Sequence, residues 1–149
     1  MKNDQIIDVE FVKRQEGANR PHMVLVDDDP LFGHLLEYVA KSQRIHLTVI
    51  SSPEEAYRIL PSLKFDVGLF DFDLGKATGI QLCNYLQREG QKVPIMLLSQ
   101  YGEIDNWRWP ISVKRSVEKK IGPLSILTLA MQIYQENETQ EESYAGRLQ

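Results

Sequence analysis

The sequence predicts an α/β fold in which helices cover both faces of a doubly wound, five-stranded parallel sheet. Short apolar segments of strand length alternate with segments of helical periodicity over most of the 149 residues. Such alternation favours parallel strands, because each crossover helix packs back onto the sheet. The length fits one domain, and a hydrophobic content of 42% is ordinary for a globular protein.

The first half of the chain contains two predicted strand–helix pairs: strands 22–27 and 45–50, and helices 31–41 and 53–60. Leu31, Leu35 and Val39 recur four residues apart, which is the spacing of one helix face. The second helix has a start signal, since Ser52 can cap it and Pro53 suits its first position.

The second half repeats this rhythm with strands 66–71, 93–99 and 112–119 and with helices 79–89 and 123–135. A further helix, the fourth along the chain, is expected between the last two strands. We expect it to be short or irregular, because Asn106 and Pro110 limit its length.

The chain divides into an N-terminal extension (1–20), the folded domain (21–135) and an acidic tail (136–149) that we expect to be flexible. Within the extension, the partly alternating stretch IIDVEFV is a candidate extra strand. The tail carries four Glu against one Arg, and the extension balances four acids against four bases, so the domain is nearly neutral within the net charge of −4. A neutral domain argues against nucleic-acid binding.

The composition also bears on the compartment. There is no apolar run of the roughly 18 residues that a membrane span needs. No signal-peptide pattern opens the chain, and the one cysteine, Cys83, excludes an internal disulfide and argues against a zinc cluster. A cytoplasmic location is therefore the expectation.

Polar side chains end four of the predicted strands: Asp27 and Asp28 the first, Asp71 the third, Ser99 the fourth and Lys119 the fifth. Ligand sites of open α/β sheets form outside the carboxyl ends of the strands. We therefore expect Asp71 to face Asp27 and Asp28, with a hydroxyl and an ammonium group on its other side.

Clustered carboxylates repel one another unless a cation joins them. Oxygen ligands suit Mg²⁺, which keeps waters and completes its shell on phosphate oxygens. The pattern thus predicts a Mg²⁺ site that handles a phosphoryl group, with Asp71 as the nucleophile. Lys119 and the Ser99 hydroxyl would stabilise the phosphoryl oxygens as fixed groups.

The stretches VLVDDDP, GLFDFDLGKATG, VPIMLLS and VEKK resemble, in order and spacing, the four signatures of the response-regulator receiver domain of two-component signalling. The resemblance covers about residues 22–135. It implies a flavodoxin-like sheet of strand order 2-1-3-4-5. It also implies a phospho-acceptor rather than a turnover enzyme, a sensor histidine kinase or phosphotransfer protein as the donor, and output through a downstream protein target.

The same resemblance implies a role for each site residue. Asp71 is the phospho-acceptor, and Asp28 and Asp71 bind Mg²⁺ directly. Asp27 binds through water, and Asp73 through its backbone carbonyl. Ser99 is implied as the switch hydroxyl and Lys119 as the lysine of the site.

Besides Gly75, which stands where the family often has Pro, three positions depart from the family pattern. Gln100 stands where the family has a small residue, Ser116 where it has Tyr or Phe, and Lys120 where it has Pro. These departures leave the phosphorylation chemistry intact and alter the usual output face. They motivate an alternative function, in which a receiver-fold interaction module or homodimer signals without a phosphorylation cycle.

Two other interpretations are weighed against these. Asp71-Phe72-Asp73 also resembles the Asp-x-Asp signature of haloacid-dehalogenase-like phosphatases, but there the motif follows the first strand, and here it follows the third. Lys119 and Lys120 could form a solvated edge, and the sequence leaves open which of them is the ligand.

Overall fold

The computed structural model of the chain describes residues 20–102 and 109–147. The candidate extra strand lies outside these residues. So does 103–108, within the segment where a short fourth helix is expected, and that expectation stays untested.

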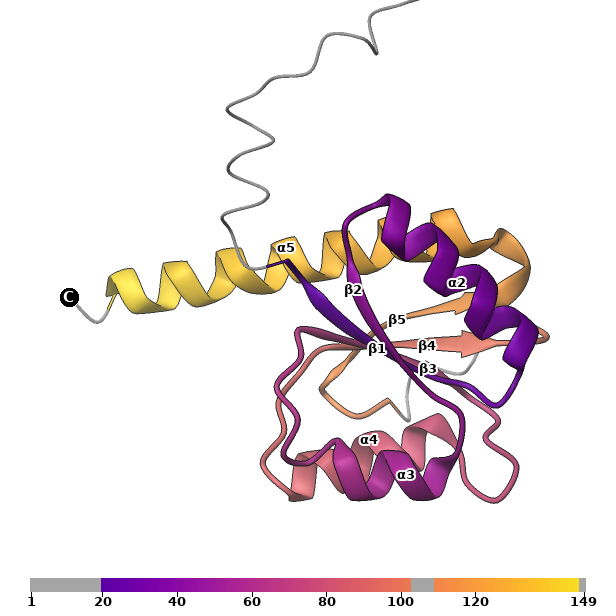
Figure 1. The fold of residues 1–149 in the computed structure, drawn as a ribbon. Coiled ribbons are helices and arrows are strands. Elements are labelled where there is room, and N and C mark those ends of the chain that lie inside the picture. The colour runs from indigo at the N-terminus through magenta and orange to yellow at the C-terminus, as the bar shows by residue number, and fades with distance from the viewer. Residues whose placement is uncertain (1–19, 103–108, 148–149) are drawn as a thin grey trace, which may run out of the picture.

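Five parallel strands form one sheet (Figure 1): β1 (His22–Val26), β2 (His46–Ile50), β3 (Val67–Asp71), β4 (Ile95–Ser99) and β5 (Val113–Glu118). Their order is β2-β1-β3-β4-β5, so the predicted flavodoxin-like topology is confirmed. All residues of β3 and β4 are buried, as continuous apolar strands covered on both faces must be.

In the described ranges, four α-helices cover the sheet: α2 (Pro30–Ser42), α3 (Pro53–Ile59), α4 (Gly79–Arg88) and α5 (Pro123–Arg147). Figure 1 shows α2 and α5 on one face and α3 and α4 on the other. Successive side chains of β1 point to opposite faces of the sheet. Met23 and Leu25 join the apolar cluster beneath α2 and α5, and Val24 and Val26 join the opposite cluster.

Side-chain caps begin three of these helices. The Asp29 carboxylate accepts the backbone N–H of Leu31 at 3.0 Å at the start of α2, where Pro30 is the first residue. The predicted cap of α3 is confirmed, since Ser52 Oγ accepts the N–H of Glu55. Helix α4 begins with a reciprocal capping box between Thr78 and Gln81.

The expected end of the last helix at residue 135 is wrong, because α5 continues to Arg147 and includes most of the acidic tail. Figure 1 shows this part projecting beyond the sheet. Its residues are mostly Glu, Gln and other residues that tolerate a helix, and Asn137 Nδ2 lies 3.4 Å from Glu141 Oε1 one turn later. The prediction ended the helix where its apolar face ended, although helical propensity continued.

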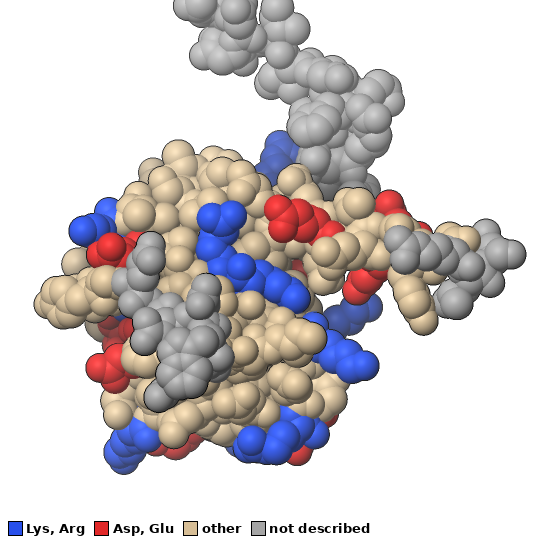
Figure 2. Space-filling view, turned by 180° about the vertical axis from the view of Figure 1, so that it is seen from behind, with Lys and Arg blue, Asp and Glu red and all other residues tan. Residues whose placement is uncertain are grey.

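The surface behind the view of Figure 1 carries both signs of charge. Figure 2 shows Lys and Arg side chains near the middle of this face and acidic side chains on the projecting helix. Lys114 and Arg115 of the edge strand β5 are exposed. Within the described ranges, none of the helices has the length and apolar character needed to cross a membrane.

Candidate phosphorylation site

Asp71 ends the central strand β3, where the backbone of α4 comes very close. A Cβ on Gly79 would lie 2.6 Å from the Asp71 carbonyl oxygen, so no larger residue fits without displacing the backbone. The Gly79 N–H donates to the Phe72 carbonyl at 2.8 Å and closes the loop between them. The small residue at the start of α4 therefore lets the helix begin directly beside the acid.

Three carboxylates meet at this edge of the sheet. Oxygens of Asp27, Asp28 and Asp71 all lie within 4.8 Å of one another. Asp27 and Asp71 are buried, with exposures of 1% and 6%, and Asp28 is exposed. The Asp29 N–H donates to Asp27 Oδ1 at 2.9 Å, which orients that side chain. The cluster is thus anchored inside and open to solvent on one side.

Lys119 joins two of these acids from the start of a short 3₁₀ helix, η3 (Lys119–Ile121). Its Nζ lies 2.6 Å from Asp27 Oδ2 and 2.8 Å from Asp71 Oδ2, and 5.0 Å from the centre of the Phe32 ring. Lys120 instead pairs with Glu118 at 3.3 Å, and its side chain is 76% exposed. The structure therefore brings Lys119, and not Lys120, to the acids.

Burial and mutual charge shift the pKa values of this cluster. Burial raises the pKa of Asp71, and the Asp27 charge raises it further, against the hydrogen bond from Lys119. Burial acts to lower the pKa of Lys119, but the paired carboxylates of Asp27 and Asp71 outweigh it and raise that pKa. Lys119 is consequently held as an ammonium group between the two acids.

The other two predicted site residues are placed differently. Ser99 ends β4 and is 4% exposed, and its Oγ donates to the Gly102 carbonyl at 2.6 Å. Asp73 is exposed, and its carboxylate accepts the Gly75 N–H at 2.9 Å. The Asp73 N–H donates to Asp71 Oδ1 at 3.1 Å. Asp73 thus supports Asp71 through its backbone, and its carboxylate is engaged elsewhere.

The three departures from the family pattern lie beside or below this edge. Gln100 is exposed, and Lys120 points into solvent. Ser116 lies opposite Leu97 in the sheet, and within the described part of the chain its buried Oγ has no hydrogen-bond partner. At the position where the family pattern has Tyr or Phe, the described structure therefore has a small side chain whose hydroxyl is unpaired.

Sequence reasoning missed one residue that shapes the site. Phe32 lies under the Lys119 ammonium, with its ring centre 5.0 Å from Nζ. No local signal pairs Phe32 with Lys119. The predicted helix start at Gly79 is confirmed, and a capping box between Thr78 and Gln81 accompanies it.

The comparisons with known proteins agree on one family. The family model described as "Response regulator receiver domain" matches residues 23–121. The chain is 28% identical over 87 residues to response regulator protein PilR of Pseudomonas aeruginosa, covering 58% of this chain and 20% of PilR. It is 37% identical over 79 residues to heme response regulator HssR of Staphylococcus saprophyticus, covering 51% of this chain and 34% of HssR. The chain thus matches between 20% and 34% of the length of these relatives.

A solved structure supports the fold independently. The CheY-like response regulator receiver domain protein of Methanospirillum hungatei superimposes with a TM-score of 0.73 at 15% identity, covering 82% of this chain and 99% of that one. At this identity the likeness speaks for the fold alone. Together with the family match over most of the sheet, it leads to the assignment: the chain belongs to the response regulator receiver domain family, a signalling domain of two-component systems.

Proposed function

We propose that Asp71 accepts a phosphoryl group from a phosphohistidine of a sensor histidine kinase or phosphotransfer protein, in a Mg²⁺-dependent transfer. The observation that carries this proposal is Lys119 Nζ, held between Asp27 Oδ2 and Asp71 Oδ2. A fixed cation beside the nucleophile lies where phosphoryl charge would arrive. A cytoplasmic location is part of the same proposal.

The donor set fits a magnesium ion. Asp27, Asp28 and Asp71 offer carboxylate oxygens within 4.8 Å of one another, and Asp28 is open to solvent. The backbone hydrogen bonds of the following loop use the carbonyls of Phe72, Leu74 and Ala77, so we infer that the Asp73 carbonyl can serve as a further ligand. When bound, Mg²⁺ would supply positive charge that offsets the phosphoryl oxygens during transfer.

The proposed transfer is a single displacement at phosphorus. A carboxylate oxygen of Asp71 forms the new bond to phosphorus, and the bond from phosphorus to the donor imidazole nitrogen breaks with its electron pair left on that nitrogen. As negative charge moves from the carboxylate to a phosphoryl oxygen, the Lys119 ammonium would pair with that oxygen instead. Asp71 itself keeps the phosphoryl group after the transfer, so the domain acts as an acceptor and not as a turnover enzyme.

The signal would leave the site through Ser99. Its hydroxyl donates to the Gly102 carbonyl at 2.6 Å, and a phosphoryl oxygen on Asp71 would compete for the same proton. Exchange of that partner would release the loop that follows β4. We infer that a downstream protein target reads the changed loop, as a two-state surface.

The test compares two neighbouring acids in intact-mass measurements. A small acyl phosphate with Mg²⁺ should add one phosphoryl group to the wild type and to Asp73→Asn, because the Asp73 carboxylate only accepts the Gly75 N–H. Asp71→Asn should gain none, and a chelator should abolish the gain in the wild type. A phosphoryl group on Asp71→Asn, or none on the wild type, would contradict the proposal.

Two observations favour a second function, that of an interaction module working without phosphorylation, including as a homodimer. Ser99 is already satisfied by Gly102, and Ser116 replaces the aromatic reporter with an unpaired hydroxyl. This function predicts equal oligomeric state and target affinity for wild type and Asp71→Asn. A phosphorylation-dependent change in sedimentation or affinity excludes it.

A further inference from the structure

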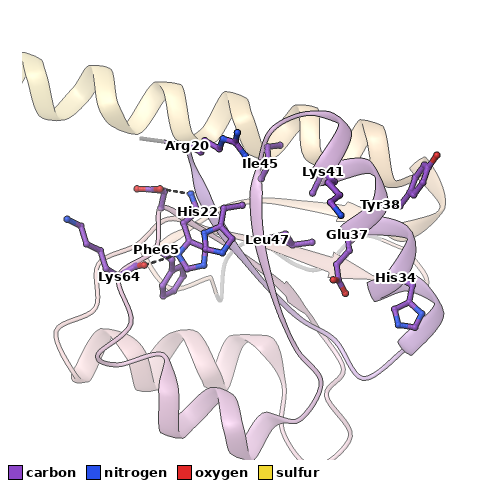
Figure 3. Close-up of a pocket in the computed structure, with 13 residues that line it drawn as sticks. Arg20, His22, His34, Glu37, Tyr38, Lys41, Ile45, Leu47, Lys64 and Phe65 are labelled. Carbon is purple, nitrogen blue, oxygen red and sulfur yellow. Dashed lines mark hydrogen bonds between the residues drawn. The ribbon is translucent and has the colours of Figure 1, made fainter. Parts of the chain in front are cut away.

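A groove runs along the outer side of β2, toward the opposite end of the sheet from the acid cluster. Its volume is about 1050 Å³, and helix α2, the starts of β1 and β2 and the segment before β3 line it (Figure 3). The charged side chains of its lining are Arg20, Glu37, Lys41, Lys64 and Asp66. Cations are therefore in excess, and the phosphorylation chemistry uses none of them.

The backbone of β2 offers hydrogen-bonding groups to this groove. The His46 N–H donates to the Pro21 carbonyl, and the Ile50 carbonyl accepts the Asp27 N–H, both at 3.1 Å. Because the N–H and C=O groups of successive residues alternate along a strand, those of Thr48 also point to β1. Those of Leu47 and Val49 point to the open side. In the described ranges β2 ends the sheet, so this edge is a template for another strand.

The two faces of this edge differ in chemistry. On the α2 side, Leu47 and Val49 are partly buried and pack against the apolar cluster beneath the helix. On the other side, the His22 and His46 rings stack at 4.1 Å, close to Lys64, whose carbonyl lies 3.0 Å from His22 Nδ1. Asp66 also lines this part of the groove, and its carboxylate accepts the His22 N–H at 2.7 Å. An added strand should accordingly be apolar on the α2 face and polar on the other.

We propose that residues 5–12 of this chain occupy the groove as a sixth strand, paired antiparallel to β2. Ile7, Val9 and Phe11 alternate with Asp8 and Glu10 in that stretch, so one face is apolar. The other face carries the two acids at its centre, with Ile6 and Val12 at its ends. This pattern suits the edge, with the apolar face toward α2 and Asp8 and Glu10 toward the polar side, where Lys64 and the two histidines lie.

The connection between the segment and the domain has sufficient length. The eight residues 13–20 span up to about 28 Å when extended. The end of an antiparallel strand beside β2 would lie about 10 Å from the start of β1, two strand spacings away. Arg20, the last residue of the connection, already lines the groove.

The proposed pairing fixes which amides are bonded. Opposite residues of an antiparallel pair share a face, so the odd-numbered residues of the segment lie opposite Leu47 and Val49 and exchange hydrogen bonds with them. The Val9 N–H then points to β2, and the Asp8 N–H points to solvent. Proline should disrupt the strand at position 9 and be tolerated at position 8.

The experiment measures amide hydrogen exchange by NMR in the full chain. In the wild type the Leu47 and Val49 amides should be protected, as His46 and Thr48 are by β1. Val9→Pro should speed exchange at Leu47 and Val49 by about tenfold or more and leave His46 and Thr48 unchanged. The matched control Asp8→Pro should keep all four protected.

Three outcomes overturn the proposal. The first is equal exchange of Leu47 and Val49 in the wild type and in Val9→Pro. The second is an equal loss of protection at all four amides, because the segment pairs only with the outer edge. The third is protection that falls on dilution, which would mean that a second copy supplies the strand. Phosphorylation of Asp71 plays no part in this test, so its result is independent of the proposed function.

Discussion

Replacement of Lys119 by Met tests how the buried acids are held together. The substitution keeps an unbranched side chain of similar length and removes the ammonium group. In the folded protein Nζ contacts Asp27 Oδ2 at 2.6 Å and Asp71 Oδ2 at 2.8 Å. The side chain of Lys119 is 11% exposed, that of Asp27 is 0% exposed and that of Asp71 is 8% exposed. Lys119→Met therefore leaves two adjacent buried carboxylates without their cation.

The magnitude follows from that burial. Removal of one partner from a buried ion pair costs about 3–5 kcal/mol of unfolding free energy. Here the cluster opens to solvent at Asp28, and Asp71 can take up a proton because its pKa is already raised by burial. We therefore expect a loss of about 2–4 kcal/mol. Mg²⁺ should restore part of it, because the metal supplies the missing positive charge.

The assay is urea unfolding followed by circular dichroism, first with a chelator and then with excess Mg²⁺. Lys120→Met is the matched control. Its ion pair with Glu118 is surface-exposed, so it should cost no more than about 0.5 kcal/mol. Equal stability of the two variants in chelator would refute the reasoning, since Lys119 would then not compensate the buried acids.

Three further outcomes follow from single residues. Burial lowers the pKa of His22, and the charge of a neighbouring histidine lowers it further, so the unfolded chain binds this proton more readily than the folded one. The unfolding free energy should therefore be full above pH 6.5 and fall below it. In pH-dependent unfolding, His22→Gln should show a shallower fall than the wild type. Gly79→Ala should cost about 1–3 kcal/mol in urea unfolding, because its Cβ would lie 2.6 Å from the Asp71 carbonyl oxygen. Gly75→Ala should cost about 1 kcal/mol, because its Cβ would meet open space but its backbone stands at φ +80°. A larger cost for Gly75→Ala than for Gly79→Ala would be inconsistent with the close approach of α4 to Asp71. Thr78→Ala should lower the unfolding free energy by about 1 kcal/mol through loss of the α4 cap, and Thr78→Ser should retain most of it.

Much of the fold could be read from local pattern. Parallel strands covered on both faces appear as short continuous apolar runs, and β1, β3 and β4 were found within two residues of their ends. The end of α5 was missed, because an exposed helix that continues on propensity alone has no apolar periodicity to mark it.

The site was predictable where a general rule of topology applied. Parallel strands end at the same edge of a sheet, so Asp27, Asp28 and Asp71 could be expected to meet, and they do. The contacts of the Ser99 hydroxyl could not be predicted in this way. Its partner, the Gly102 carbonyl, depends on how the loop after β4 turns, and no side-chain pattern specifies that turn.

The sequence by itself determined which residues end the strands, and hence which chemical groups the site contains. The tertiary structure decided which of those groups touch. Lys119 and Asp71 are 48 residues apart, and adjacent Lys119 and Lys120 have the same chemistry and nearly the same local surroundings. Only the end of β5 and the first turn of η3 direct Lys119 inward and Lys120 into solvent. The physical reason is that local signals act between near neighbours, whereas this pairing depends on the direction in which the chain leaves the sheet.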